Sequence, residues 1–327
     1  MRSKITTFAV AALVLGLFSP AEAQQPKKVP RIGYLSATSP SVNPSRVEGF
    51  RQGLRELGYV EGKNIIIEWR YAEGKLDRVG GLAADLVRLK VDVIVTAGPT
   101  ATPAVKKATA TIPVVMGYDN DPVGSGFVSS LAHPGGNITG LSALFPELSG
   151  KRLELLKEIL PRLSRVAVLG TSTQPGNAQA LKEVELAARA LRVQLQYLDV
   201  LNPKDVEIAF RAASKGRADA VLVLVGPVFN SHRIQVADLA VKNRLPAVYG
   251  QPQYVEDGGL LSYAPNYSDL FRRAATYVDK ILKGAKPADL PVEQPTKFEF
   301  IINLKAAKQI GLMISPNVLA RADKVIK

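Results

Sequence analysis

The sequence contains no cysteine, and this absence limits how the protein can be held together. Without cysteine no disulfide forms, so the fold depends on its apolar core alone. A lipoprotein is excluded for the same reason, because the lipid of a lipoprotein is attached to a cysteine directly after the signal peptide. Histidine is almost as scarce, with His133 and His232 far apart in the chain.

Motifs for catalysis and metal binding are missing as well. The chain has no HExxH, GxSxG or P-loop sequence and no metal-ligand spacing. The segment 98–102 follows an apolar run, as a phosphate loop would, but lacks the Gly-Lys-Ser/Thr end. A metal held by His133 with Asp119 or Asp121 is a minor alternative. We therefore expect no enzyme, no cofactor and no metal.

Long apolar runs are absent beyond the N-terminus, so we expect no membrane insertion. The run 8–18 is too short to span a bilayer; Arg2 and Lys4 precede it, and the small-x-small segment 21–23 follows it. This arrangement predicts a cleaved signal peptide over residues 1–23, with an uncleaved anchor as the alternative. Together with the missing cysteine, it predicts a freely soluble protein of the periplasm.

Positive charge is in excess, with a formal net charge of +13. The basic residues are scattered along the chain and accompany no nucleic-acid motif, so we expect no nucleic-acid partner. We interpret the excess as a solvated basic surface. Steering of an anionic ligand, or docking on an acidic membrane protein, are the alternatives.

From residue 30 onward, short apolar runs alternate with amphipathic stretches, a pattern typical of βα units around a parallel sheet. The pattern runs through one series and then starts again near residue 165. We expect strands at 31–36, 64–69, 91–96, 113–117 and 137–142, and then at 165–170, 193–200, 219–225 and 247–249. The fold class is therefore α/β, with two lobes of similar topology, each built on a parallel sheet.

The C-terminal quarter departs from this alternation. It contains an expected strand at 260–263, a long helix at 267–283, a proline-rich connector and an alternating strand at 297–303. This part is too short to bury a core of its own. We therefore expect it to cross back between the two lobes.

Polar, hydroxyl-rich loops follow the expected strands in both lobes. In open parallel sheets, ligands bind at this edge, and loops that precede helices can hold a carboxylate with backbone N–H groups. For any one of these residues, helix capping is the alternative role. The loops are 36–39, 96–102, 118–123, 171–177, 226–230 and 249–253. The candidate ligand-binding residues are Ser36, Thr38, Thr96, Gly98, Thr100, Ala101, Tyr118, Asp121, Thr171, Ser172, Asn177, Pro227, Val228, Tyr249 and Gln253.

Several segments resemble a known family. The stretches RIGYLSATSP, VDVIVTAGPTATPAVKKATATIPVVM and GGLLSYAPNYSDLFRRAATYVDKILKG, and above all Asp121-Pro122-Val123 followed by PGGNITG at 134–140, are similar to ABC-transporter substrate-binding proteins of the TrpX-like branch. The resemblance implies a type I periplasmic-binding fold, in which two Rossmann-like lobes are joined by three hinge crossovers, near 142–150, 263–266 and 295–298. It implies one lobe from 30–145 with 264–294, and a second from 146–263 with 295–327.

The same resemblance implies a function. The protein would be a monomer that captures a small solute between its lobes by hinge closure. An inner-membrane permease would recognise the closed form, and a separate subunit would hydrolyse ATP. A periplasmic sensor that presents its closed form to a receptor kinase or chemoreceptor is the alternative. An exported hydrolase or isomerase is disfavoured by the separated histidines, and a transcriptional regulator by the signal.

Characterised members of the branch are associated with aromatic amino acids. Thr100 and Ala101 match the family's small-polar loop, and Asp121 matches its Asp-Pro-Val. Members that bind amino acids tend to have an acidic residue where this chain has Gln174, and an Asp-Asn pair where the loop 226–230 has none. Burying an ammonium without a counter-charge is costly, so we predict an aromatic or short-chain carboxylate rather than an amino acid. Four aromatic residues could form a wall on which the ligand stacks, although aromatic residues near a strand end lie as often in the core: Tyr118, Phe229, Tyr249 and Tyr254.

Overall fold

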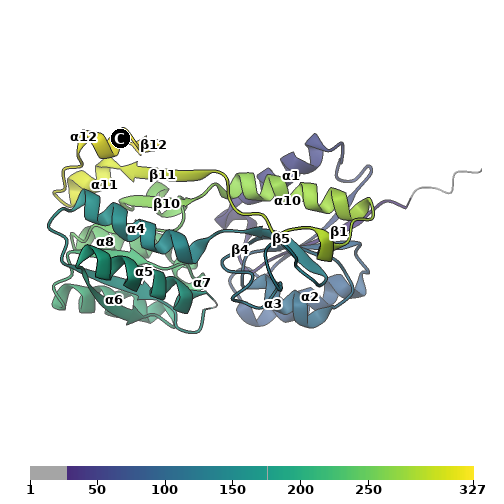
Figure 1. The fold of residues 1–327 in the computed structure, drawn as a ribbon, viewed down its shortest axis with the longest axis horizontal. Helices are drawn as coiled ribbons and strands as arrows, with labels where there is room; N and C mark the ends of the chain where they lie inside the picture. The colour runs from purple at the N-terminus through teal and green to yellow at the C-terminus, as the bar shows by residue number, and fades with distance from the viewer. Residues whose placement is uncertain (1–27, 175) are drawn as a thin grey trace, which may run out of the picture.

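The structure is a computed structural model that describes residues 28–174 and 176–327. The predicted signal peptide, residues 1–23, lies outside the described residues. Two α/β lobes lie side by side, and chain segments pass between them (Figure 1). Across residues 28–327 without 175, no helix has both the length and the apolar composition to cross a bilayer.

The first lobe contains strands β1 to β5 and four of the α-helices. Its strands are β1 (Arg31–Ser36), β2 (Ile66–Tyr71), β3 (Val93–Ala97), β4 (Val114–Asp119) and β5 (Ile138–Ser142). Its helices are α1 (Pro44–Glu56), α2 (Val79–Arg88), α3 (Ala101–Ala108) and α10 (Tyr267–Leu282), with the 3₁₀ turns η1 (Pro40–Val42), η2 (Leu76–Arg78) and η3 (Pro287–Asp289).

The second lobe contains the remaining elements. Its strands are β6 (Arg165–Gly170), β7 (Gln194–Asp199), β8 (Ala220–Val223), β9 (Ala247–Tyr249), β10 (Leu261–Pro265), β11 (Phe298–Asn303) and β12 (Lys324–Ile326). Its helices are α4 (Phe145–Ile159), α5 (Asn177–Leu191), α6 (Pro203–Lys215), α7 (Pro227–Ser231), α8 (Arg233–Lys242), α9 (Gln253–Glu256), α11 (Leu304–Gln309) and α12 (Pro316–Leu319).

The two sheets share one strand order. Within the described residues, the first sheet runs β2-β1-β3-β4-β5, and the second runs β12-β11-β10-β9-β8-β6-β7. Counted from β6, the second sheet repeats the order 2-1-3-4-5, so the prediction of two similar α/β lobes is confirmed. The first sheet is parallel throughout, whereas β11 pairs antiparallel with β10 at the far side of the second sheet. Because β12 pairs parallel with β11, the predicted pair of parallel sheets needs two strands of opposite direction added, both at this side of the second sheet.

Helices cover both faces of each sheet, which explains why the central strands are apolar on both sides. In the first lobe, α1 and α10 pack together over one face. Two glycines of α1 make this contact close, because a Cβ added at Gly49 would lie 2.4 Å from the Ser268 carbonyl oxygen, and one at Gly53 would lie 2.2 Å from that of Arg272. Helix α10 therefore completes the core of the first lobe although it follows β10 of the second.

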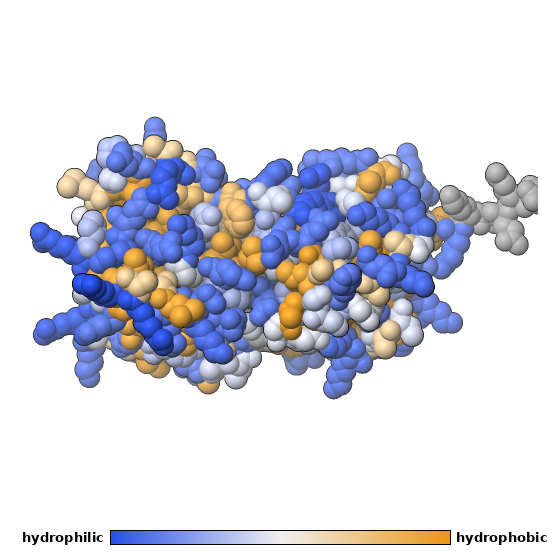
Figure 2. Space-filling view, in the orientation of Figure 1, coloured by the Kyte–Doolittle hydropathy of each residue, from blue (hydrophilic) through white to orange (hydrophobic). Residues whose placement is uncertain are grey.

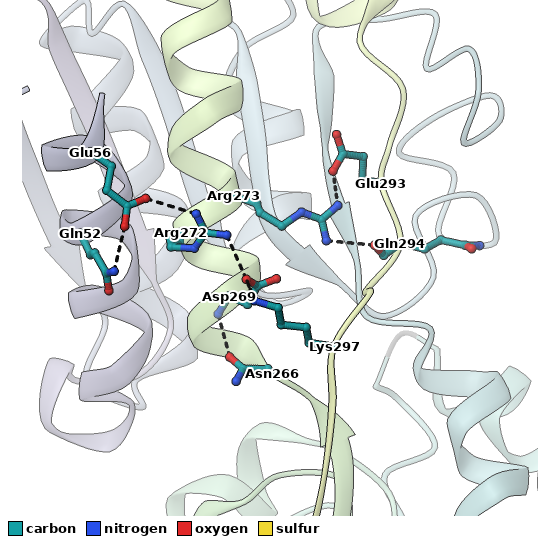
Figure 3. A network of polar contacts seen from close by, with 9 residues as sticks. All are labelled: Gln52, Glu56, Asn266, Asp269, Arg272, Arg273, Glu293, Gln294 and Lys297. Atoms are coloured by element: carbon teal, nitrogen blue, oxygen red, sulfur yellow. Dashed lines mark hydrogen bonds and ion pairs between the residues drawn. The ribbon is translucent and has the colours of Figure 1, made fainter. Parts of the chain in front are cut away.

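Three crossovers join the lobes, and they bond to one another. The third runs between the other two: Ser142 N–H donates to the Glu293 carbonyl at 2.9 Å, and Asn266 N–H donates to the Lys297 carbonyl at 3.0 Å. Side chains reinforce the ribbon, because Lys297 contacts the Asp269 carboxylate at 3.2 Å, and Arg273 pairs with Glu293 (Figure 3). The hinge is therefore a bonded three-stranded ribbon.

A buried arginine also lies at this hinge. Arg152 of α4 has no exposed surface; its Nε donates to the Tyr263 carbonyl at 2.8 Å, and its Nη1 donates to Ser149 Oγ at 3.2 Å. Its guanidinium lies 4.7 Å from the centre of the Phe145 ring. Burial lowers the pKa of Arg152 to about 10. The side chain therefore ties the helix after the first crossover to the strand before the second.

Candidate functional site

A pocket lies between the lobes, at the carboxyl ends of the strands of both sheets. Its walls come from five of the six polar loops and from the N-terminal turn of α1. The first lobe contributes Ala37, Thr38, Asn43, Arg46, Ala97, Gly98, Pro99, Thr100 and Tyr118, and the second contributes Gln174, Val225, Gly226, Pro227 and Asn230. This is the edge at which open α/β sheets bind ligands.

The lobes also touch at the rim of this pocket. A Cβ added at Gly176 would lie 3.4 Å from Asn120 Cβ, and one at Gly74 would lie 3.7 Å from Ser231 Oγ, each across the interlobe gap. The face of the molecule seen in Figure 2 is largely hydrophilic, and apolar residues form small separate groups on it. The two close approaches show that the lobes come near each other at the rim of the pocket.

Arg46 is the charged residue of the pocket. It is 4 % exposed and projects from the first turn of α1. Its guanidinium carbon lies 4.9 Å from the centre of the Tyr118 ring and 4.4 Å from that of Tyr267, and its Nη1 donates to the Tyr118 hydroxyl at 3.1 Å. Among the described residues its Nε and Nη2 have no hydrogen-bond partner.

The loop after β3 is shaped by the same tyrosine. Gly98 has φ +113°, and a Cβ there would lie 2.8 Å from the Tyr118 hydroxyl, so only glycine fits both the backbone and the space. This turn places Thr100 as the N-cap of α3, whose first turn contains no acidic residue. The loop thus presents a helix N-terminus and a hydroxyl to the pocket.

The second lobe closes the pocket with neutral groups. Gln174 comes from the loop after β6, and Val225, Gly226 and Pro227 come from the turn between β8 and α7. Asn230 is positioned by the Tyr254 hydroxyl, which donates to its Oδ1 at 3.2 Å. Amide and apolar groups, without a charge, therefore face Arg46 across the cleft.

The structure brings five of the predicted site residues together in the pocket walls: Thr38, Gly98, Thr100, Tyr118 and Pro227. Ser36 lies just behind, with its Oγ 3.3 Å from Thr38 Oγ1. Thr96 and Ala101 are buried, and Thr96 Oγ1 lies 2.9 Å from Thr102 Oγ1. Asp121 shapes a turn, because its Oδ1 accepts from Gly124 N–H at 2.9 Å.

In the second lobe, most predicted site residues serve the fold. Thr171 Oγ1 donates to the Val200 carbonyl, Ser172 bonds Asp199, and Asn177 Nδ2 donates to the Thr171 carbonyl. Val228 is half-buried on α7 and packs against the core beside Phe229. Tyr249 is fully buried and stacks on Tyr254 at 4.6 Å, so of the expected stacking wall only Tyr118 lines the pocket. Gln253 lines a neighbouring interlobe groove with Ser45, Glu256, Tyr267 and Glu299.

Sequence reasoning missed Arg46 and Asn43. The available signal was the position of Arg46 on the face of α1 that also carries Phe50 and Gly53, four and seven residues further on. A cation in an otherwise apolar helical face indicates either a buried pair or a ligand contact.

One acidic residue near the pocket is unusual. Asp119, at the end of β4, is fully buried; its Oδ1 accepts from Asp121 N–H at 3.1 Å, while its Oδ2 has no partner among the described residues. Burial raises the pKa of this carboxyl to about 7. Across the described part of the chain, no three His, Cys, Asp or Glu residues form a group able to hold a metal ion.

Known proteins resemble this chain in sequence and in fold. A family model described as ABC transporter substrate binding protein matches residues 38–326. A tyrosine-binding protein of Clostridioides difficile is 26% identical over 273 residues, which cover 84% of this chain and 78% of that protein. A Streptococcus protein solved in complex with L-Trp is 28% identical with a TM-score of 0.85, and covers 91% of this chain and 99% of its own. A conserved domain protein of Vibrio cholerae is 29% identical with a TM-score of 0.86, at 91% and 100% coverage.

Proposed function

Because the chain belongs to the ABC transporter substrate binding protein family, we propose that it captures a small carboxylate-bearing solute between its lobes and delivers it to a membrane permease. Closing the lobes about the crossover ribbon would trap the solute and create the surface that the permease recognises. ATP hydrolysis would belong to a separate subunit. The predicted signal peptide supports a site of action in the periplasm.

The observation that carries this proposal is the interlobe pocket with Arg46 in its wall. Both lobes contribute to it at the carboxyl ends of their strands, so its ligand contacts would depend on lobe closure. A buried guanidinium whose Nε and Nη2 have no hydrogen-bond partner among the described residues favours a ligand with a carboxylate. The relatives that bind tyrosine and L-Trp make aromatic amino acids candidate ligands, beside aromatic and other small carboxylic acids. The relatives reported above give no support to the sensor alternative.

Thermal shift tests the proposal on the mature chain, residues 24–327. The panel holds aromatic amino acids, their deaminated acids and short carboxylates. A ligand at 100 times its dissociation constant should stabilise the folded protein by about 2.7 kcal/mol. If no member of the panel raises the melting temperature, a carboxylate-binding role is refuted.

A matched pair of variants locates the site. Gln174→Ala changes a pocket wall of the second lobe and should weaken binding several-fold. Gln179→Ala changes an exposed residue of α5 outside the pocket and should leave binding unchanged. Equal affinities of the two variants, measured by calorimetry, would place the ligand elsewhere.

A further inference from the structure

Arg46 carries a buried charge that no carboxylate in the described chain balances. The side chain forms no ion pair with any described residue, although only 4 % of the residue is exposed to solvent. Its two ring neighbours attract the cation through their π faces, which offsets a small part of the cost of removing a charge from water. Tyr267 supplies no counter-charge, because burial raises the pKa of its phenol above the usual range.

The free part of the guanidinium has a definite shape. Nη1 donates to the Tyr118 hydroxyl, while Nε and Nη2 are buried and have no hydrogen-bond partner among the described residues. These two nitrogens form one edge of the planar group, and their N–H bonds point the same way. That edge matches the two oxygens of one carboxylate in a bidentate pair. The N-terminus of α1, which has no acidic residue in its first turn, adds positive potential at the same place.

The other pocket residues are neutral. Thr38, Asn43, Thr100, Gln174 and Asn230 offer hydroxyl and amide groups, and the remainder of the wall is apolar except for Tyr118. Asn43 Oδ1 is buried and unpartnered among the described residues, so it can accept a hydrogen bond from a ligand hydroxyl. A ligand ammonium would find no opposite charge in this wall, and burying it there is costly.

Nearby carboxylates do not change this balance. In the neighbouring groove, Glu256 lies 3.6 Å from the ammonium of Lys324, and Glu299 accepts from Asn266 Nδ2 at 2.7 Å. Asp119 is fully buried and does not line the pocket. The wall therefore carries a net positive charge.

We propose that the solute is an organic carboxylate without an ammonium group, paired through its carboxylate with the free edge of Arg46. This inference rests on the proposed function and narrows its ligand to one class. A small hydroxy acid or aromatic acid has the matching chemistry, because its carboxylate can pair with Arg46 while its body meets neutral groups of the wall.

Calorimetry with matched ligands tests the absence of the ammonium. Tyrosine is compared with 3-(4-hydroxyphenyl)lactate, and tryptophan with indole-3-lactate, each pair differing in an ammonium against a hydroxyl. The hydroxy acid should bind at least about tenfold more tightly. An amino acid that binds as tightly as its matched hydroxy acid, or more tightly, overturns the inference but leaves the proposed function intact. If no acid and no amino acid binds, both fail.

Variants of Arg46 test the anchor. Arg46→Met retains a side chain of similar length without the charge, so it should fold and lose the response to carboxylates. Arg46→Lys keeps the charge but not the two-pronged edge, and should weaken binding about 10- to 100-fold. Phenylacetate serves as the probe, with phenylacetamide as its uncharged control and inorganic phosphate and sulfate as other anions. Equal responses of wild type and Arg46→Met, or stabilisation by phosphate or sulfate but not by carboxylates, would overturn the assignment.

Discussion

The contact between α1 and α10 gives a prediction whose size can be worked out from the structure. In a Gly53→Ala variant the new methyl group would meet the Arg272 carbonyl oxygen at 2.2 Å and Ala275 Cβ at 2.8 Å. The first of these partners is helix backbone, which cannot turn aside as a flexible side chain would. The two helices must therefore move roughly 1 Å apart at this point, which loosens the contacts around it.

The expected loss combines two opposing effects. Overpacking against backbone costs about 3 kcal/mol, at the upper end of its usual range. Replacing glycine by alanine inside a helix gains about 1 kcal/mol. The free energy of unfolding should therefore fall by about 2 kcal/mol, which corresponds to a melting temperature about 4–8 °C lower.

Urea unfolding followed by circular dichroism measures this change, and Gly81→Ala is the matched control. Gly81 lies in α2, is exposed, and has no atom within 4 Å of an added Cβ. There the same substitution should stabilise by about 0.5–1 kcal/mol. If Gly53→Ala is as stable as wild type or more so, the reasoning from close helix contact is refuted.

Three further predictions concern buried polar groups. Burial raises the pKa of Asp119 to about 7, so the folded protein binds more protons than the unfolded chain between about pH 4 and about pH 7. Its stability should therefore fall as the pH rises through this window. Asp119→Asn should melt higher than wild type at about pH 8 but not at about pH 4. If the difference in melting temperature between Asp119→Asn and wild type is the same at both pH values, the prediction is contradicted. Arg152→Ala should lower the free energy of unfolding by about 3 kcal/mol, and Arg152→Met should lower it by less, because methionine fills the volume. Equal losses for the two variants, measured by urea unfolding, would show that packing is not the cause. Tyr118→Phe removes the hydroxyl that accepts from Arg46 and should cost about 1–2 kcal/mol in the same assay, whereas an unchanged midpoint would mean that this hydrogen bond adds no stability.

Much of the fold follows from local patterns. The apolar runs at 31–36, 165–170 and 247–249 are strands β1, β6 and β9 at the expected residues, because buried strands between helical layers are apolar on both faces. Helix α8 gives little signal in the sequence, since its buried positions Val236, Ala237 and Ala240 are mostly small and form a weak helical pattern. The order of the strands is set by long-range packing, which no local pattern contains.

The site was less accessible to sequence reasoning. The polar loops were predicted at the carboxyl ends of the strands, where the pocket lies. A local pattern does not say which way each side chain at a strand end points. Thr38 lines the pocket, whereas Thr96 bonds Thr102 inside the lobe. Tyr249 illustrates the same difficulty, because its ring stacks on Tyr254 in the core. Arg46 was overlooked because a single basic residue near a helix start resembles many others in a chain with 42 lysines and arginines.

The position of α10 has a consequence for how the protein is made. Most of the first lobe is encoded before residue 143, but α10 lies between β10 and β11, strands of the second sheet. Gly49 and Gly53 leave α1 a surface that only α10 fills. The first lobe therefore cannot finish folding during synthesis until nearly the whole chain has emerged. The second lobe is also incomplete until β11 and β12 arrive, so both lobes should reach their native packing late and close together in time.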